Sequence, residues 1–174
     1  MQIREIDSNT CSSRVEDLSG LLQACVNDGA SIGFMAPLAG GEASAFWSGI
    51  ASQLLPGQRR MWVAEAGDGA WLATVQLVLA MPANGRHRAE IVKLMVHPAA
   101  RRRGLAKMLM EQAELAALAE KRSLLVLDTR SGDKAEPLYL SLGFELAGRI
   151  PAYAASSDGG LDSTSVMYKL LELA

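Results

Sequence analysis

Residues 91–106 read Ile91-Val92-Lys93-Leu94-Met95-Val96-His97-Pro98-Ala99-Ala100-Arg101-Arg102-Arg103-Gly104-Leu105-Ala106. The apolar first half predicts a strand that Pro98 ends, and the basic loop after it leads into an amphipathic helix over 104–119. The first turn of a helix leaves backbone N–H groups without partners and carries the positive end of the helix dipole. Gly104 allows a ligand to approach the backbone closely. The stretch therefore predicts a binding site for an anion such as a pyrophosphate.

Apolar periodicity predicts further strands and helices on both sides of this stretch. We expect strands over 2–6, 61–66, 71–79, 89–96, 124–127, 144–150 and 165–170. We expect helices with apolar faces over 15–26, 46–54, 104–119 and 135–142. On the long helix this face includes Met108 and Leu115, whereas residues 8–10 look like helix breakers or caps. The strands before and after the long helix should be parallel, because a helical crossover joins them.

The composition is that of one globular domain over residues 1–174, with 49% hydrophobic and 21% charged residues. A formal net charge of -2 gives no overall attraction to nucleic acid or to an anionic membrane. There is no apolar run long enough to span a bilayer and no secretory signal, so we expect a cytoplasmic protein. Cys11 and Cys25 are then expected as thiols. Two scattered histidines, His87 and His97, predict no metal site.

Arg101-x-x-Gly104-x-Ala106 resembles the Gln/Arg-x-x-Gly-x-Gly/Ala signature of the GNAT acetyltransferases. The resemblance implies an α/β fold with a mixed, mostly antiparallel sheet of six to seven strands and about four helices. Two parallel strands of this sheet splay apart at a CoA site. Acetyl-CoA is thereby implied as cosubstrate, and the residues expected to bind it are Leu94, Met95, Val96, Arg101, Arg102, Arg103, Gly104, Leu105, Ala106, Lys107 and Thr129.

A second segment, residues 135–144, resembles the family's Ala-x-x-x-Tyr-x-x-x-Gly-Phe pattern. The resemblance implies that Tyr139 points toward the CoA sulfur and protonates the leaving thiolate. Gly143 ends the short helix, as is common for glycine at this position. Many members of the family have an asparagine near the position of Gly132, and here its role falls to Thr129, to Ser131 or Asp133, or to no residue.

Acetylation of an amine needs a base, because a primary alkyl amine is protonated near neutral pH. Glu90 matches the position of a catalytic glutamate in some members of the family. An outward-facing carboxylate beside Arg88 is an equally good interpretation of Glu90. His97 is a rival base and is also typical of a solvated loop. Because neither cysteine lies near the motif, we expect direct transfer in a ternary complex without a covalent acetyl-enzyme.

The acceptor pocket is expected between the N-terminal helices and the late loop. Its candidate residues, each equally typical of core packing, are Phe34, Met35, Trp47 and Tyr153. Segments over 29–35, 93–96 and 127–129 are similar to the tabtoxin resistance proteins of this superfamily. This similarity implies a small amino-acid-like acceptor and a role in toxin or antibiotic resistance.

Two groups of charged residues are candidates for holding such an acceptor. An ammonium group would meet Asp128, Glu65 or Asp158, and a carboxylate would meet Arg130 or Arg149. Acetylation of a protein or peptide, and a non-catalytic module that senses acyl-CoA, are the alternative functions. Members of the family are often homodimers, and this sequence leaves the oligomeric state open.

Overall fold

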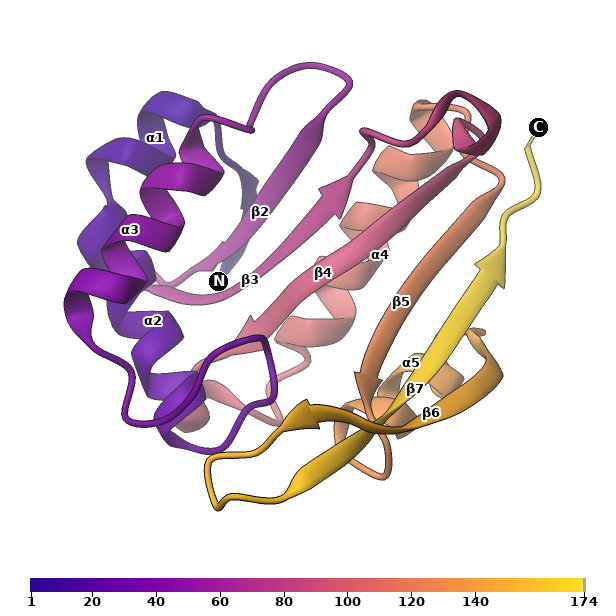
Figure 1. The fold of residues 1–174 in the computed structure, drawn as a ribbon. Coiled ribbons are helices and arrows are strands. Elements are labelled where there is room, and N and C mark those ends of the chain that lie inside the picture. Colours follow the sequence, from indigo (N-terminus) through magenta and orange to yellow (C-terminus); the bar gives the residue numbers. More distant parts are fainter. Residues whose placement is uncertain (174) are drawn as a thin grey trace.

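The structure, a computed structural model, describes residues 1–173 (Figure 1). Its strands are β1 (Gln2–Glu5), β2 (Arg59–Glu65), β3 (Trp71–Val78), β4 (Arg88–Val96), β5 (Leu124–Arg130), β6 (Glu145–Ala155) and β7 (Leu161–Leu170). Its α-helices are α1 (Ser8–Ser13), α2 (Val15–Asn27), α3 (Gly40–Ala51), α4 (Leu105–Ala119) and α5 (Ala135–Ser141). Short 3₁₀ turns lie at Ala83–Gly85 and Pro98–Ala100. Within the described range no helix has the length and apolar character needed to cross a bilayer.

The strands form a seven-stranded sheet in the order β1-β2-β3-β4-β5-β7-β6. Every neighbouring pair is antiparallel except β4 and β5, which α4 connects. The mixed, mostly antiparallel sheet expected from the sequence is thus confirmed. The parallel pairing covers only three positions, from Arg88 opposite Leu124 to Glu90 opposite Val126. Beyond Glu90 the two strands diverge, and Figure 1 shows their lower ends wide apart.

Helices cover both faces of the sheet (Figure 1). Helices α1–α3 pack on one face over a core that includes the fully buried side chains of Leu18, Leu22 and Trp47. Helices α4 and α5 pack on the other face over a second core, which includes Leu109 and Leu125. The sheet therefore separates two hydrophobic cores.

Four local expectations were wrong. The helix expected over 46–54 begins at Gly40 and ends at Ala51, because small residues precede its apolar face. Residues 8–13 form helix α1, because the Asp7 carboxylate caps it by accepting the Thr10 N–H at 2.7 Å. Met108 and Leu115 are 37% and 59% exposed, because Ala113 and Ala117 are the residues that bring α4 close to the sheet. Strands β6 and β7 are longer than expected, since hairpin pairing rather than an apolar pattern extends them.

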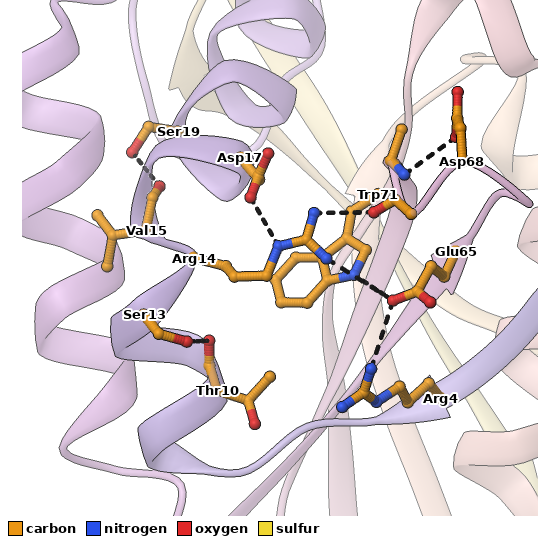
Figure 2. A network of polar contacts seen from close by, with 12 residues as sticks. Arg4, Thr10, Ser13, Arg14, Val15, Asp17, Ser19, Glu65, Asp68 and Trp71 are labelled. Carbon is orange, nitrogen blue, oxygen red and sulfur yellow. Dashed lines mark hydrogen bonds and ion pairs between the residues drawn. The ribbon is translucent and has the colours of Figure 1, made fainter.

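A polar network fastens α2 to the turn between β2 and β3 (Figure 2). The Arg14 guanidinium lies 4.0 Å from the centre of the Trp71 ring, donates to the Gly69 carbonyl at 2.8 Å and pairs with Asp17. Glu65 accepts the Trp71 indole N–H at 2.9 Å and lies within ion-pair distance of Arg14. Each charge of this network has a partner, so we assign it a structural role.

Candidate active site between β4 and β5

A cavity of about 820 Å³ fills the split between β4 and β5. Its walls come from 91–96 of β4, 128–130 of β5, the start of α4, α5, and the loop after α2. Ala89, Ile91 and Leu127 pack in the core beneath α4, so their neighbours Glu90 and Asp128 face the side of α1–α3. The cavity therefore reaches both faces of the sheet, and two substrates entering from opposite faces can meet in it.

A β-bulge shapes the β4 wall of this cavity. Thr74 lies opposite Met95 and Gln76 opposite Val92, so β4 carries one more residue than β3 between these pairs. Lys93 has a left-handed φ of 55°, which is unusual for a residue with a side chain. Bulges bend a strand and redirect side chains. Here the bend carries β4 away from β5 and leaves its backbone groups without a strand partner on that side.

The start of α4, expected from the sequence to bind an anion, lies at the mouth of the cavity. Gly104 has a φ of 78°, and a Cβ built there would meet no atom within 4 Å. The unpaired N–H groups of the first helical turn therefore face open space. Arg102 and Lys134 line this mouth from the two loops, and Arg101 pairs with Asp28. Arg103 is exposed and does not line the cavity. These features fit a pyrophosphate and an extended pantetheine arm along β4.

Tyr139 lies on the α5 wall of the cavity and is 6% exposed. Burial raises the pKa of its hydroxyl well above the usual value, and Asp128 and Asp133 add to this. The helix ends directly after it, where the Phe144 N–H donates to the Tyr139 carbonyl at 3.0 Å. Tyr139 is therefore a protonated acid inside the cavity at neutral pH.

Glu136 holds α5 in place and was not singled out by the sequence. Its carboxylate accepts the Gly132 N–H at 2.8 Å, an Arg149 N–H at 2.6 Å and the Ser165 hydroxyl at 3.2 Å. These bonds, led by the Gly132 N–H, lower the pKa of Glu136. The loop at Gly132, where the family often has asparagine, is thus fixed by a glutamate from the following helix.

Glu90 occupies the last paired position before β4 and β5 diverge. It is partly buried and does not line the cavity itself, although the next residue, Ile91, does. Burial lowers the pKa of the Arg59 guanidinium, and the nearby Glu90 carboxylate opposes this effect. The rival base, His97, accepts the Ala99 N–H on Nδ1 at 3.2 Å, so this nitrogen is already occupied.

A loop over 28–36 roofs the cavity on the side of α1–α3. Asp28 pairs with Arg101, and the Ile32 carbonyl accepts a hydrogen bond from Lys93 Nζ at 2.8 Å. The Ala36 N–H donates to Ser157 Oγ at 2.8 Å, which joins the loop to the turn between β6 and β7. The two segments approach each other at the bottom of Figure 1. The loop therefore narrows the cavity on this side, while Asp128 and Tyr153 of its wall stay exposed.

The expected acceptor residues lie in different places. Asp128 and Tyr153 line the cavity, together with Thr129 from the cofactor set. Phe34 packs edge-on against Phe46 at 5.1 Å behind the roof, and Met35 is 48% exposed. Trp47 is fully buried in the core beneath α3, where its indole fills space between the helices and the sheet. A substrate contact by Trp47 is therefore excluded in this arrangement.

Of the acids considered for binding an ammonium group, only Asp128 is available to a ligand. Glu65 lies in the network of Figure 2, and Asp158 accepts from Ser156 and from the Gly160 N–H within its own turn. Asp128 accepts one hydrogen bond, from the Thr164 hydroxyl at 2.8 Å, and is otherwise exposed to the cavity.

The arginines considered for binding a carboxylate are both engaged. Arg130 pairs with Asp133 at 3.1 Å and Asp162 at 3.5 Å. Arg149 pairs with Glu136 at 2.6 Å. Arg149 does not line the cavity, and Arg130, which does, already has two carboxylate partners.

The structure brings one cysteine next to the motif, contrary to the expectation from the sequence, because Cys25 lines the cavity and its Sγ donates to the Val96 carbonyl at 3.5 Å. Cys11 and Cys25 are buried thiols whose pKa burial raises to about 11, so neither is a thiolate near neutral pH. Residues 1–173 hold no group of three or more His, Cys, Asp or Glu side chains placed to bind a metal ion.

Comparison with known proteins agrees with this geometry. Residues 57–146 match the acetyltransferase (GNAT) domain family. The fold is similar to a GCN5-related N-acetyltransferase from Kribbella flavida, with a TM-score of 0.79 and 23% identity over 98% of this chain and 97% of that one. It is also similar to a ribosomal-protein-alanine N-acetyltransferase from Brucella melitensis (TM-score 0.77, 19% identity, 98% and 100% covered).

A third similar structure is a phosphinothricin acetyltransferase from Sinorhizobium meliloti in complex with acetyl-CoA (TM-score 0.79, 19% identity, 98% and 88% covered). At these identities the likeness concerns the fold. By their names, two of these neighbours act on different acceptors, a ribosomal protein and phosphinothricin. The choice of acceptor has to be argued from the cavity itself.

Proposed function

The chain belongs to the acetyltransferase (GNAT) domain family, and we propose that it transfers the acetyl group of acetyl-CoA directly to a primary amine of a small, amino-acid-like molecule. The observation that carries this proposal is the roofed cavity that opens to both faces of the sheet. Acetyl-CoA enters along the unpaired edge of β4 with its pyrophosphate at the start of α4. The amine approaches from the face of α1–α3.

Three side chains are assigned chemical roles. Asp128 binds the acceptor as an ammonium ion on the face away from α4. Glu90 accepts the proton of this ammonium through water, because it lies beside the cavity wall rather than on it. The neutral amine attacks the thioester carbon, the C–S bond breaks, and Tyr139 donates its proton to the departing thiolate. The second proton of the amine leaves the nitrogen as the amide forms and passes through water to Tyr139, which restores its hydroxyl.

A small acceptor is favoured over a protein because of the roof. A peptide substrate needs room along the cavity, whereas the hydrogen bond from the Ala36 N–H to Ser157 Oγ narrows it on the side of α1–α3. We further propose that the reaction inactivates a toxin or antibiotic that resembles an amino acid, such as tabtoxinine-β-lactam. The free thiols Cys11 and Cys25 are in keeping with a cytoplasmic enzyme.

The test is release of CoA thiol from acetyl-CoA across a panel of amines: tabtoxinine-β-lactam, amino acids, polyamines, aminoglycosides and lysine peptides. We expect turnover with small amino-acid-like amines, and loss of kcat in Glu90→Gln without loss of acetyl-CoA binding. Turnover with peptides alone would favour the protein acetyltransferase. Tight acetyl-CoA binding without turnover of any amine would favour the sensor module.

A further inference from the structure

Lys93 is a cation of the cavity wall to which the proposed reaction assigns no role. Its Nζ donates to the Ile32 carbonyl at 2.8 Å and lies 5.9 Å and 5.8 Å from the ring centres of Phe34 and Phe46. An ammonium group carries three N–H donors, and this hydrogen bond uses one. Among residues 1–173 no carboxylate lies within ion-pair distance of it.

Burying the Lys93 ammonium group costs more free energy than is needed if the lysine only anchors the loop. Removing an ammonium from water without a paired anion is unfavourable, and burial accordingly lowers the pKa of Lys93. The left-handed backbone at the bulge adds strain. A neutral amide side chain would supply the same hydrogen bond to Ile32 without burying a charge. The two aromatic rings near Nζ attract the charge only weakly, so an anionic group of a ligand in the cavity would be a stronger partner.

Lys93 also lies on the correct face of the sheet for contact with the acceptor. Its neighbours Ile32, Phe34 and Phe46 belong to the roof and to α3, opposite Tyr139 and α4. The Asp128 carboxylate is near enough to favour the charged form of Lys93, yet the two form no ion pair. The cavity is thus lined by a carboxylate from Asp128 and by an ammonium group from Lys93. Arg130 and Arg149, the other cations considered for this purpose, are both paired.

We infer that Lys93 is a specificity-determining residue, and that its ammonium group binds an anionic group, such as a carboxylate, on the acceptor while Asp128 binds the amine. This inference rests on the proposed function and narrows its substrate class to amines that carry a negative charge. The bulge serves to aim Lys93 into the acceptor side of the cavity.

The experiment compares acids with matched amides that lack the negative charge, for example L-lysine with L-lysinamide and glycine with glycinamide. In Lys93→Met, which keeps an unbranched side chain one atom shorter and removes the charge, we expect kcat/KM for the acids to fall about 10- to 100-fold relative to the amides. Lys93→Arg should keep most of the preference. Lys121→Met is the matched control, because Lys121 has the same φ of 55° and is exposed. The dissociation constant of acetyl-CoA and the unfolding midpoint are measured for each variant.

The possible outcomes separate the inference from the proposed function. An equal fall for acids and amides in Lys93→Met would mean that the lysine only anchors the loop, which overturns the inference. Wild-type turnover with no preference for acids overturns it as well and leaves the small-amine transferase standing. Absence of turnover with every small amine sinks the proposed function, and the inference falls with it.

Discussion

Tyr139 lines the cavity in an environment that opposes the ionisation of its hydroxyl. A thiolate that leaves in such a space needs a proton donor within reach, and Tyr139 is a buried acid on the α5 wall. For Tyr139→Phe we expect kcat to fall about 100-fold with little change in acetyl-CoA affinity. Single-turnover kinetics with a matched binding measurement separates the two quantities. A variant with wild-type kcat would remove Tyr139 from the mechanism.

The burial of Tyr139 should also make the stability of the protein depend on pH. Tyrosine in the unfolded chain ionises at about pH 10, whereas the folded state keeps the Tyr139 proton to higher pH. The folded state then binds more protons, so stability decreases as pH rises above about 10 and is unaffected below it. We expect the wild type to lose more stability than Tyr139→Phe between about pH 9 and pH 11 in urea unfolding. If the wild type and Tyr139→Phe lose equal amounts of stability over this range, the raised pKa of Tyr139 is contradicted.

Gly104 has a conformation that only glycine adopts readily. Because a Cβ there meets no atom of the protein, Gly104→Ala should lose only about 1–2 kcal/mol of stability from backbone strain. Acetyl-CoA affinity should fall by more than this, since the Cβ would occupy the space assigned to the pyrophosphate. Calorimetry of unfolding and of binding compares the two losses. If affinity is unchanged, the pyrophosphate lies elsewhere.

At the scale of elements, α5 is positioned from its first turn rather than by a large apolar face. Glu136→Leu would leave the Gly132 N–H, the Ser165 hydroxyl and Arg149 without their acceptor, a loss of about 1–3 kcal/mol. Since α5 carries Tyr139, we expect kcat to fall while the KM for amines changes little. Arg149→Met is the milder control, because its side chain is 53% exposed. Hydrogen exchange should show faster opening of α5 in Glu136→Leu alone.

Elements with a strong local pattern were predictable, and contacts between distant segments were not. The strand, the Pro98 turn and the long helix of residues 91–119 were predictable, because each depends on residues that lie close together in the sequence. The anion site proposed there stays a prediction. The bulge at Lys93 depends on pairing with β3, and the exposed strand β6 depends on its hairpin partner. The pairing of Arg149 with Glu136 likewise joins β6 to α5. The apolar pattern of a single segment does not reveal its contacts with distant segments.

At the scale of the whole molecule, charge is unevenly distributed. The net charge is -2, yet Arg102 and Lys134 meet at the mouth of the cavity beside the N-terminus of α4. A polyanionic acetyl-CoA is thus attracted locally by a protein that is acidic overall. We expect its dissociation constant to rise roughly tenfold between about 0.05 M and about 0.5 M salt. Arg102→Ala with Lys134→Ala should weaken binding at low salt and flatten this dependence, whereas Lys121→Ala should not. A salt-independent affinity in the wild type would mean that the mouth does not contact the phosphates.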